Sequence, residues 1–269
     1  METELKFAIL IDADNISDKY IKIILEETAN SGVATYKRIY GDWTSPQLAS
    51  WKSVLLDNSI IPMQQYSYTS GKNATDCAMI IDAMDILYSG TVDGFCIASS
   101  DSDFTRLVAR LRESGMQVIG MGESKTPKPF IAACNQFKYL DLLFSNQQKK
   151  EKKAAAERPL IKEIRSSVKE KSRASKKESA APPPEDIQPQ SDLDVIKLTI
   201  AAIVEKFSDE DGWIFSGKLG DQLSKRLPDF DVRNFGYAKL TPFVKSLGDY
   251  EINRISNGSH QQQIYFKAK

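Results

Sequence analysis

The sequence predicts two folded domains, an N-terminal domain of the α/β class with a mainly parallel sheet and a smaller C-terminal domain. Residues 5–144 alternate continuous apolar runs with amphipathic helical patterns, which is typical of a parallel sheet covered by helices. The composition changes abruptly after residue 145 and again at residue 191. A chain of 269 residues is also long enough for two modest domains joined by a linker.

Five apolar runs in the first of these regions are predicted to form the strands of the sheet. They are continuous and rich in β-branched residues, as expected of strands that are covered on both faces. Two helical patterns between them end at Gly32 and Gly115, because glycine readily adopts the left-handed conformation that stops a helix. The predicted strands are residues 6–12, 35–41, 60–66, 94–100 and 117–122.

Residues 146–190 are predicted to form a disordered linker that is basic and rich in proline. The segment has few apolar residues and contains three consecutive prolines, Pro182 to Pro184. Such a composition buries too little apolar surface to fold alone. Its lysines and arginines outnumber its acids, so it either contacts nucleic acid or is simply solvated.

Residues 191–269 are predicted to form the second domain. Three amphipathic helical patterns come first, and the second of them begins at Ser216 and ends before Pro228. Two strand patterns then flank Asn257 and Gly258, a dipeptide typical of a β-hairpin turn. Three helices followed by a hairpin form the order of a winged helix, a variant of the helix-turn-helix.

The amino-acid composition excludes several kinds of chemistry. His260 is the only histidine and lies in a polar run, so mechanisms that need histidine as a general base or zinc ligand have almost nothing to use. The three cysteines are far apart and embedded in apolar sequence, so we interpret them as core residues. The N-terminus shows no signal-peptide pattern, and no apolar stretch reaches the length of a membrane span. We therefore expect a cytoplasmic protein with no membrane partner.

Acidic residues follow the predicted strands. In an open parallel sheet, the residues just after the strands converge at one edge, even when they are far apart in sequence. Asp76 begins a helical pattern, and we expect it to project towards the same edge. The other acids expected there follow the first, second and fourth strands and are Asp12, Asp14, Asp42, Asp101 and Asp103.

Several carboxylates at one edge repel each other, and a bound divalent cation that prefers oxygen ligands relieves this repulsion. The pattern therefore predicts a Mg²⁺ or Mn²⁺ site and, because such ions bind phosphate oxygens, phosphodiester hydrolysis. Any single aspartate after a strand is explained equally well as a helix N-cap. Several separate strand and helix ends that bring acids to one edge favour the metal site. The residues expected to contact substrate beside these acids are Lys72, Ser99, Ser100 and Lys125.

Five strings of residues carry this pattern along residues 5–144: ILIDADNIS, IYGDW, GKNATDCAMIIDAMD, CIASSDSDFTRLVARLRESGMQVIGMG and ESKTPKPFIAACNQFKYLDLL. Together they resemble the NYN domain of the LabA-like group, a branch of the PIN-type nucleases. The resemblance implies a PIN-like three-layer α/β/α sandwich over residues 1–145 and a metal-dependent ribonuclease site. It implies Asn15 as a substrate-binding residue and Asp42 as a metal ligand. The acids that it implies as both catalytic and metal-binding are Asp12, Asp76, Asp101 and Asp103.

The string GWIFSGKLGDQLSKRLPDFDVRNFGYAKLTPFVKSL, followed by YEINRI and the terminal strand, resembles the OST-HTH or LOTUS domain. The resemblance covers residues 193–267 and implies contacts with RNA or with a protein partner through basic helices. We interpret Trp213, Phe235 and Tyr237 as core residues and not as a base-stacking surface. The candidate RNA or partner contacts are Lys218, Lys225, Arg226, Arg233, Lys239 and Lys245.

Three other functions are compatible with part of the pattern. A haloacid-dehalogenase-type phosphatase also places D-x-D after an apolar strand, with Asp12 as nucleophile and Asp14 as acid and base, but it needs Thr or Val where Asn15 stands. A receiver-type phosphoacceptor domain does not account for Asp76 or for the C-terminal segment. A non-catalytic RNA-binding or scaffold protein remains compatible with all of the residues. The sequence leaves open the RNA target, endonucleolytic cleavage and homodimer formation.

Overall fold

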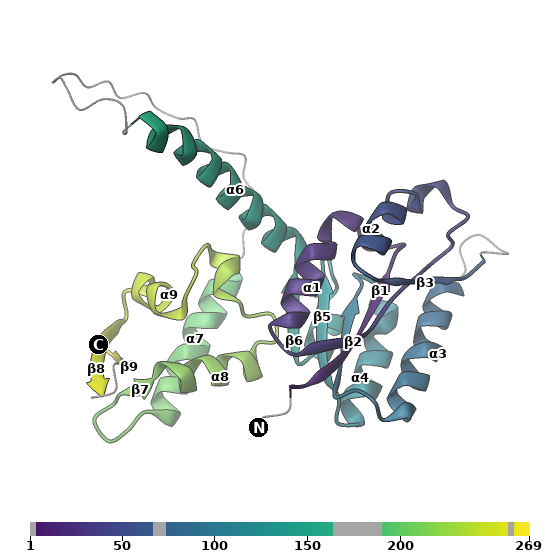
Figure 1. The fold of residues 1–269 in the computed structure, drawn as a ribbon. Helices are drawn as coiled ribbons and strands as arrows, with labels where there is room; N and C mark the ends of the chain where they lie inside the picture. Colours follow the sequence, from purple (N-terminus) through teal and green to yellow (C-terminus); the bar gives the residue numbers. More distant parts are fainter. Residues whose placement is uncertain (1–3, 67–73, 164–189, 258–260) are drawn as a thin grey trace. The chain divides into compact units, whose positions relative to one another are not determined.

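The computed structural model describes residues 4–66, 74–163, 190–257 and 261–269. The described residues up to 163 are called the N-terminal unit and those from 190 onward the C-terminal unit, and each is described by itself (Figure 1). Among the described residues, none of the helices has the length and apolar character of a membrane span.

The N-terminal unit is built on a six-stranded sheet with the strand order β3-β2-β1-β4-β5-β6. All neighbouring strands are parallel. The order changes direction at β1, which pairs with both β2 and β4, and this is where ligands bind in open parallel sheets. The strands are β1 (Lys6–Asp12), β2 (Val33–Gly41), β3 (Ile61–Gln64), β4 (Gly94–Ala98), β5 (Gln117–Gly122) and β6 (Gln136–Tyr139).

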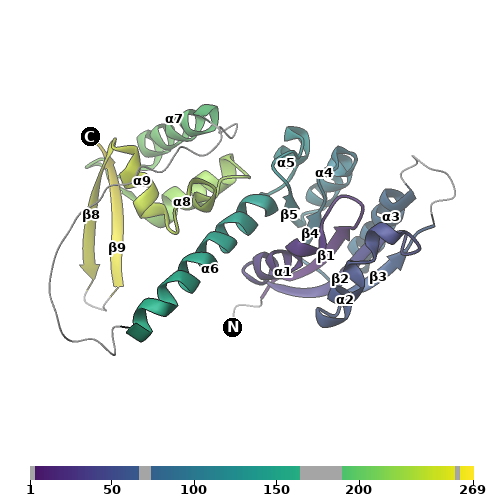
Figure 2. The same cartoon turned by 90° about the horizontal axis from the view of Figure 1, so that it is seen from above.

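Helices cover both faces of this sheet, which confirms the predicted α/β/α architecture (Figure 2). One face packs against α1 (Ile21–Ala29), α2 (Trp51–Asp57) and the start of α6 (Leu140–Glu163). The other face packs against α3 (Ala74–Ser89), α4 (Thr105–Glu113) and α5 (Lys128–Ala133). Short helical turns precede three of the helices and are η1 (Asp18–Tyr20), η2 (Pro46–Leu48) and η3 (Ser102–Phe104).

Side chains along β1 alternate between the two faces of the sheet. Ile9 and Ile11 are buried against the α1 side, whereas Ala8 and Leu10 are buried against the α3 side. Asp12 continues the second series, so its position in the strand directs it to the α3 side of the sheet. Because a parallel sheet is covered on both faces, these strands are apolar on both sides, as the sequence predicts.

Two features of the N-terminal unit differ from the expectation. The sixth strand, β6, was not predicted, because four residues are too few to show a period. Helix α6 continues to Glu163, well into the segment predicted as a disordered linker. The segment from residue 146 to 163 is rich in Lys, Glu, Gln and Ala, which are strong helix formers even where they have no apolar face.

The C-terminal unit has the predicted order of three helices and a hairpin. A short strand, β7, was not expected and pairs with β9 to give a three-stranded antiparallel sheet in the order β7-β9-β8. The third helix begins at Leu240, after Gly236, which interrupts the chain with φ of +80°. The elements are α7 (Gln190–Phe207), β7 (Ile214–Phe215), α8 (Ser216–Arg226), η4 (Val232–Phe235), α9 (Leu240–Leu247), β8 (Tyr250–Asn257) and β9 (Gln261–Ala268). The predicted turn residue Gly258 lies outside the described residues.

Candidate active site

Asp12 lies at the end of β1 and is completely buried. Its carboxylate accepts hydrogen bonds from Ser99 Oγ at 2.7 Å, from Asn15 Nδ2 at 2.8 Å and from the backbone N–H of Asp14 at 3.1 Å. Burial raises the pKa of Asp12, and the hydrogen bonds from Ser99 and Asn15 oppose this shift. Donors from two different loops therefore fix the orientation of this carboxylate.

The D-x-D sequence after β4 folds in the same way as the one after β1. Asp101 Oδ1 accepts the backbone N–H of Asp103 at 2.9 Å, just as Asp12 Oδ1 accepts the N–H of Asp14. Asp101 is the N-cap of η3, so the capping interpretation is correct for this residue. Capping uses one carboxylate oxygen and does not prevent the other from binding a cation.

Asp76 joins these acids from the first turn of α3. One carboxylate oxygen from each of Asp76, Asp101 and Asp103 lies within 4.8 Å of the other two. Burial and, after it, the nearby charges of Asp12, Asp101, Asp103 and Asp14 together raise the pKa of Asp76 to about 6. Five carboxylates thus share one region at the carboxyl edge of the sheet.

These residues fit a divalent cation of the Mg²⁺ or Mn²⁺ type. One carboxylate oxygen from each of three aspartates lies within 4.8 Å of the other two, and oxygen is the ligand that both ions prefer. Burial contributes most to the raised pKa of Asp76, and the charges of the neighbouring acids add to it, as expected of carboxylates close enough to repel each other. A cation would relieve this repulsion and would leave coordination positions for phosphate oxygens.

Asp42, expected from the sequence as a metal ligand, is held in the turn after β2 by hydrogen bonds. Its Oδ1 accepts hydrogen bonds from the backbone N–H of Thr44, from Thr44 Oγ1 and from Gln64 Nε2, at distances of 3.1, 2.6 and 3.0 Å. It is absent both from the group of three acids and from the charges that raise the pKa of Asp76. Among the described residues Asp42 stabilises the turn after β2, and its role as a metal ligand stays a prediction.

The two serines expected to contact substrate are buried. Ser99 is fully buried and its hydroxyl donates to Asp12, while Ser100 Oγ accepts the backbone N–H of Glu123 at 3.0 Å. Their hydroxyls therefore support the loops and Asp12 instead of facing solvent. Lys125 is exposed and forms an ion pair of 2.9 Å with Glu123, which leaves its side chain accessible to a phosphate. Lys72, the other predicted phosphate contact, lies outside the described residues.

Glu123 is a residue near this edge that the sequence patterns do not reveal. Its Oε1 accepts the hydroxyl of Tyr20 at 3.0 Å, and its Oε2 pairs with Lys125. Lys125 and Tyr20 hold the pKa of Glu123 below its usual value, although burial alone would raise it. Tyr20 comes from η1 and Glu123 from the loop after β5, so only the folded sheet brings them together.

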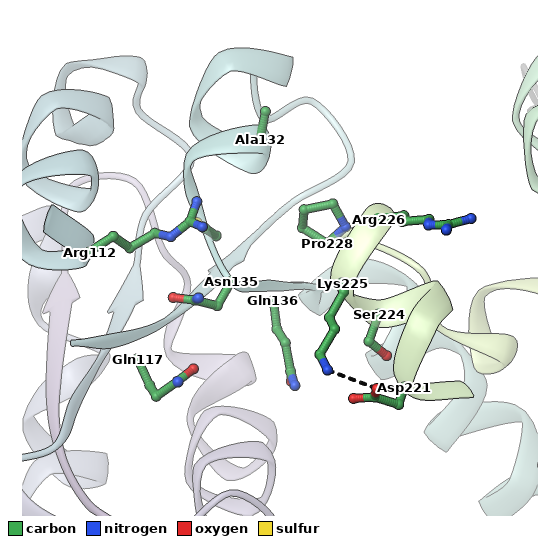
Figure 3. A pocket seen from close by; sticks show the side chains of 11 residues that line it. Arg112, Gln117, Ala132, Asn135, Gln136, Asp221, Ser224, Lys225, Arg226 and Pro228 are labelled. Atoms are coloured by element: carbon green, nitrogen blue, oxygen red, sulfur yellow. Dashed lines mark hydrogen bonds and ion pairs between the residues drawn. The ribbon is translucent and has the colours of Figure 1, made fainter. Parts of the chain in front are cut away.

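The basic residues predicted as contacts in the C-terminal unit are mostly exposed. Lys225 pairs with Asp221 one turn earlier in α8 at 2.8 Å, which Figure 3 shows as a dashed line. Arg233 is partly buried and its guanidinium bonds to Asp231 at 3.0 Å. The remaining candidates are exposed on α8, before α9 and on α9, and they are Lys218, Arg226, Lys239 and Lys245. The described geometry does not select among them.

The three C-terminal aromatic residues predicted as core residues are all partly buried, and two of them pack against a buried ring. The rings of Phe235 and Tyr237 lie 5.2 and 5.6 Å from the ring of Phe243, which is buried. Trp213 is only partly buried, and Lys267 Nζ lies 5.8 Å from its ring centre. Trp213 therefore belongs to the surface as much as to the core.

A parallel α/β/α domain with an acid cluster at the carboxyl edge of its sheet defines the class of this protein. An NYN domain model matches residues 6–141, and the chain belongs to the NYN domain family, which is part of the PIN-like nuclease superfamily. An OST-HTH/LOTUS domain model matches residues 191–262, and domains of this class are associated with RNA binding. Both resemblances inferred from the sequence are thereby confirmed.

Two solved structures are similar to parts of the chain. A protein of unknown function from Vibrio parahaemolyticus is 18% identical with a TM-score of 0.44, over 52% of this chain and 94% of that chain. An uncharacterized protein from Nitrosomonas europaea is 34% identical with a TM-score of 0.26, over 38% of this chain and 92% of that chain. No curated protein matches the chain.

Proposed function

We propose that this protein is a ribonuclease that hydrolyses phosphodiester bonds with a bound divalent cation, and that its C-terminal domain binds RNA or a partner. The observation that carries the proposal is the group of carboxylates from Asp76, Asp101 and Asp103 beside the buried Asp12. Membership of the NYN family supports hydrolysis of RNA as the reaction class. The proposed domains are residues 1–145 and 191–269, with the connecting segment between them.

Each acid has its own part in this proposal. Asp76, Asp101 and Asp103 would hold Mg²⁺ or Mn²⁺, which polarises a phosphate oxygen and lowers the pKa of a bound water. Asp12 cannot rotate freely because Ser99 and Asn15 both bond to it, so it offers a fixed acceptor to the cation or to water. Lys125 lies in the loop after β5, and we assign its side chain to contact a substrate phosphate.

The test compares cleavage of single-stranded and structured RNA by the wild-type chain and by Asp12→Asn, Asp101→Asn and Asp85→Asn variants. Asp85 is exposed on the outer face of α3 and serves as the matched control. Each reaction is run with Mn²⁺, with Mg²⁺ and with EDTA. We expect metal-dependent cleavage by the wild type and the control, and at least a hundredfold loss in both site variants.

Other outcomes distinguish the alternatives. RNA cleavage that persists in EDTA, or in well-folded Asp12→Asn and Asp101→Asn variants, contradicts the proposal. RNA binding without cleavage under any condition favours the non-catalytic RNA-binding protein. Hydrolysis of a phosphomonoester with a trapped aspartyl phosphate favours the phosphatase.

A further inference from the structure

The outer face of the three-stranded sheet in the C-terminal unit carries exposed aromatic side chains. Pairing places Ile214 opposite Phe266 on the inner face, where both are buried. The next pair, Phe215 and Tyr265, therefore lies on the opposite, outer face. Phe215 is 41% exposed and Tyr265 is partly buried. Figure 2 shows the long β8–β9 hairpin that forms most of this sheet.

The two outer rings lie side by side. Their centroids are 5.7 Å apart with an interplanar angle of 56°, so the two rings do not stack face to face on each other. Amide side chains border them, because Asn253 is paired with Tyr265 across the hairpin and Gln263 precedes Tyr265 by two positions. Tyr265 donates its hydroxyl to Gln263 Oε1 at 3.0 Å, which orients that amide.

Charges of both signs lie on this face and in the turn that precedes β7. On the outer face, Lys267 lies two residues beyond Tyr265 and reaches over Trp213, opposite Glu251 on the neighbouring strand. A second lysine, Lys218, lies 5.3 Å from the ring of Phe207 just before the turn that leads to β7. The exposed acids of that turn are Asp209, Glu210 and Asp211. Asp209 accepts the backbone N–H of Trp213 at 2.7 Å and so is engaged by its own turn.

We propose that this outer face binds single-stranded RNA by stacking bases on Phe215 and Tyr265. Aromatic rings on an open sheet are the stacking surface that unpaired bases use, and amides beside them can bond to base edges. Lys267 supplies the cation for a phosphate between stacked bases. This surface differs from the basic helices of the winged-helix plan, and the inference rests on the proposed action on RNA.

The balance of observations favours RNA over a protein partner. A protein interface of ordinary strength needs a contiguous apolar centre, whereas this face sets two rings and the exposed Ile255 among amides and the opposite charges of Lys267 and Glu251. Stacking does not require a net positive surface, although the acidic turn should make binding weak and dependent on salt. Affinity is therefore expected to come mainly from the rings.

The experiment measures binding of the full-length chain to a fluorescent single-stranded RNA of about 12 nucleotides by anisotropy, with EDTA present and RNA integrity checked on a gel. The variants are Phe215→Ala and Tyr265→Ala, with Tyr265→Phe as the conservative change that keeps the ring. Leu198→Ala is the matched control, because Leu198 is 72% exposed on α7. RNA with 2-aminopurine at one position reports stacking directly. DNA of the same sequence tests whether binding depends on the ribose.

We expect each alanine variant to bind about tenfold more weakly and to lose the 2-aminopurine signal, while Tyr265→Phe and Leu198→Ala bind like the wild type. Equal affinity in the alanine variants that retain the wild-type circular dichroism overturns the inference. So does a change from dimer to monomer in light scattering without any change in RNA affinity, because the face would then serve self-association. Cleavage by the same variants at saturating RNA is measured separately, so a failure of this inference and a failure of the nuclease proposal give different results.

Discussion

Replacement of Asp76 by asparagine is expected to stabilise the metal-free protein at alkaline pH, although it removes a proposed cation ligand. Burial and the charges of the neighbouring acids raise the pKa of Asp76 from 3.8 to about 6. A shift of about 2 pKa units corresponds to roughly 3 kcal/mol. Because the carboxylate is only partly buried, solvent screening reduces the cost to about 1–2 kcal/mol. An uncharged asparagine of similar shape removes this cost.

The sign of the pH dependence follows from linkage. The folded protein binds the Asp76 proton more tightly than the unfolded chain does, so its stability falls as the pH rises from about 4 to about 6 and stays lower above that. The gain in the free energy of unfolding from asparagine is therefore complete at about pH 8 and roughly half as large at about pH 5. This dependence separates relief of repulsion from a general improvement in packing.

The assay is thermal unfolding of the full chain in EDTA, followed by the fluorescence of Trp51, which is buried in the N-terminal core. We expect the Tm of Asp76→Asn to exceed that of the wild type by roughly 2–8 °C at about pH 8. Asp85→Asn on the exposed face of the same helix should leave the Tm nearly unchanged. A lower Tm for Asp76→Asn at pH 8, or an equal gain at both pH values, would refute the argument that the acids repel each other.

Three further predictions concern the supports of the site. Ser99→Ala removes the buried donor to Asp12 and should lower single-turnover cleavage about tenfold with unchanged filter binding of RNA; equal rates would contradict a positioning role. Gly122→Ala puts a Cβ 2.7 Å from the Ser99 carbonyl oxygen and should lower the free energy of unfolding by about 1–3 kcal/mol in urea titrations. Tyr40→Phe removes a hydrogen bond to Asp82 on α3 and should cost about 1–3 kcal/mol in the same titration. An unchanged midpoint in either titration would show that the neighbouring atoms relax freely.

Five of the six strands described in the N-terminal domain were predictable because they coincide with runs rich in apolar and β-branched residues, whereas the short β6 was not. β1 and β5 begin and end where the sequence predicts, and the parallel order follows from the helices between them. The C-terminal hairpin was predictable from its change of period. The two-residue strand β7 was not, since its pairing partner β9 lies nearly fifty residues later and leaves no local trace.

The candidate site was also predictable only in part. The D-x-D sequences after β1 and β4 predicted that acids would meet, since parallel strands bring their carboxyl ends to one edge. The burial of Ser99 and the self-contained turn of Asp42 were not predictable, because the sequence does not show which side of a loop each polar group faces.

The sequence by itself determined the fold class, the family and the edge of the sheet at which the acids gather, because periodicity and the order of elements are local properties of the chain. Only the tertiary structure decided which carboxylates lie within 4.8 Å of each other and which are held by their own turns. It also decided that Phe215 and Tyr265 share an exposed face, since strand pairing joins residues from distant parts of the chain. Distances between side chains depend on how separate elements pack, and packing depends on all of the residues that form the core.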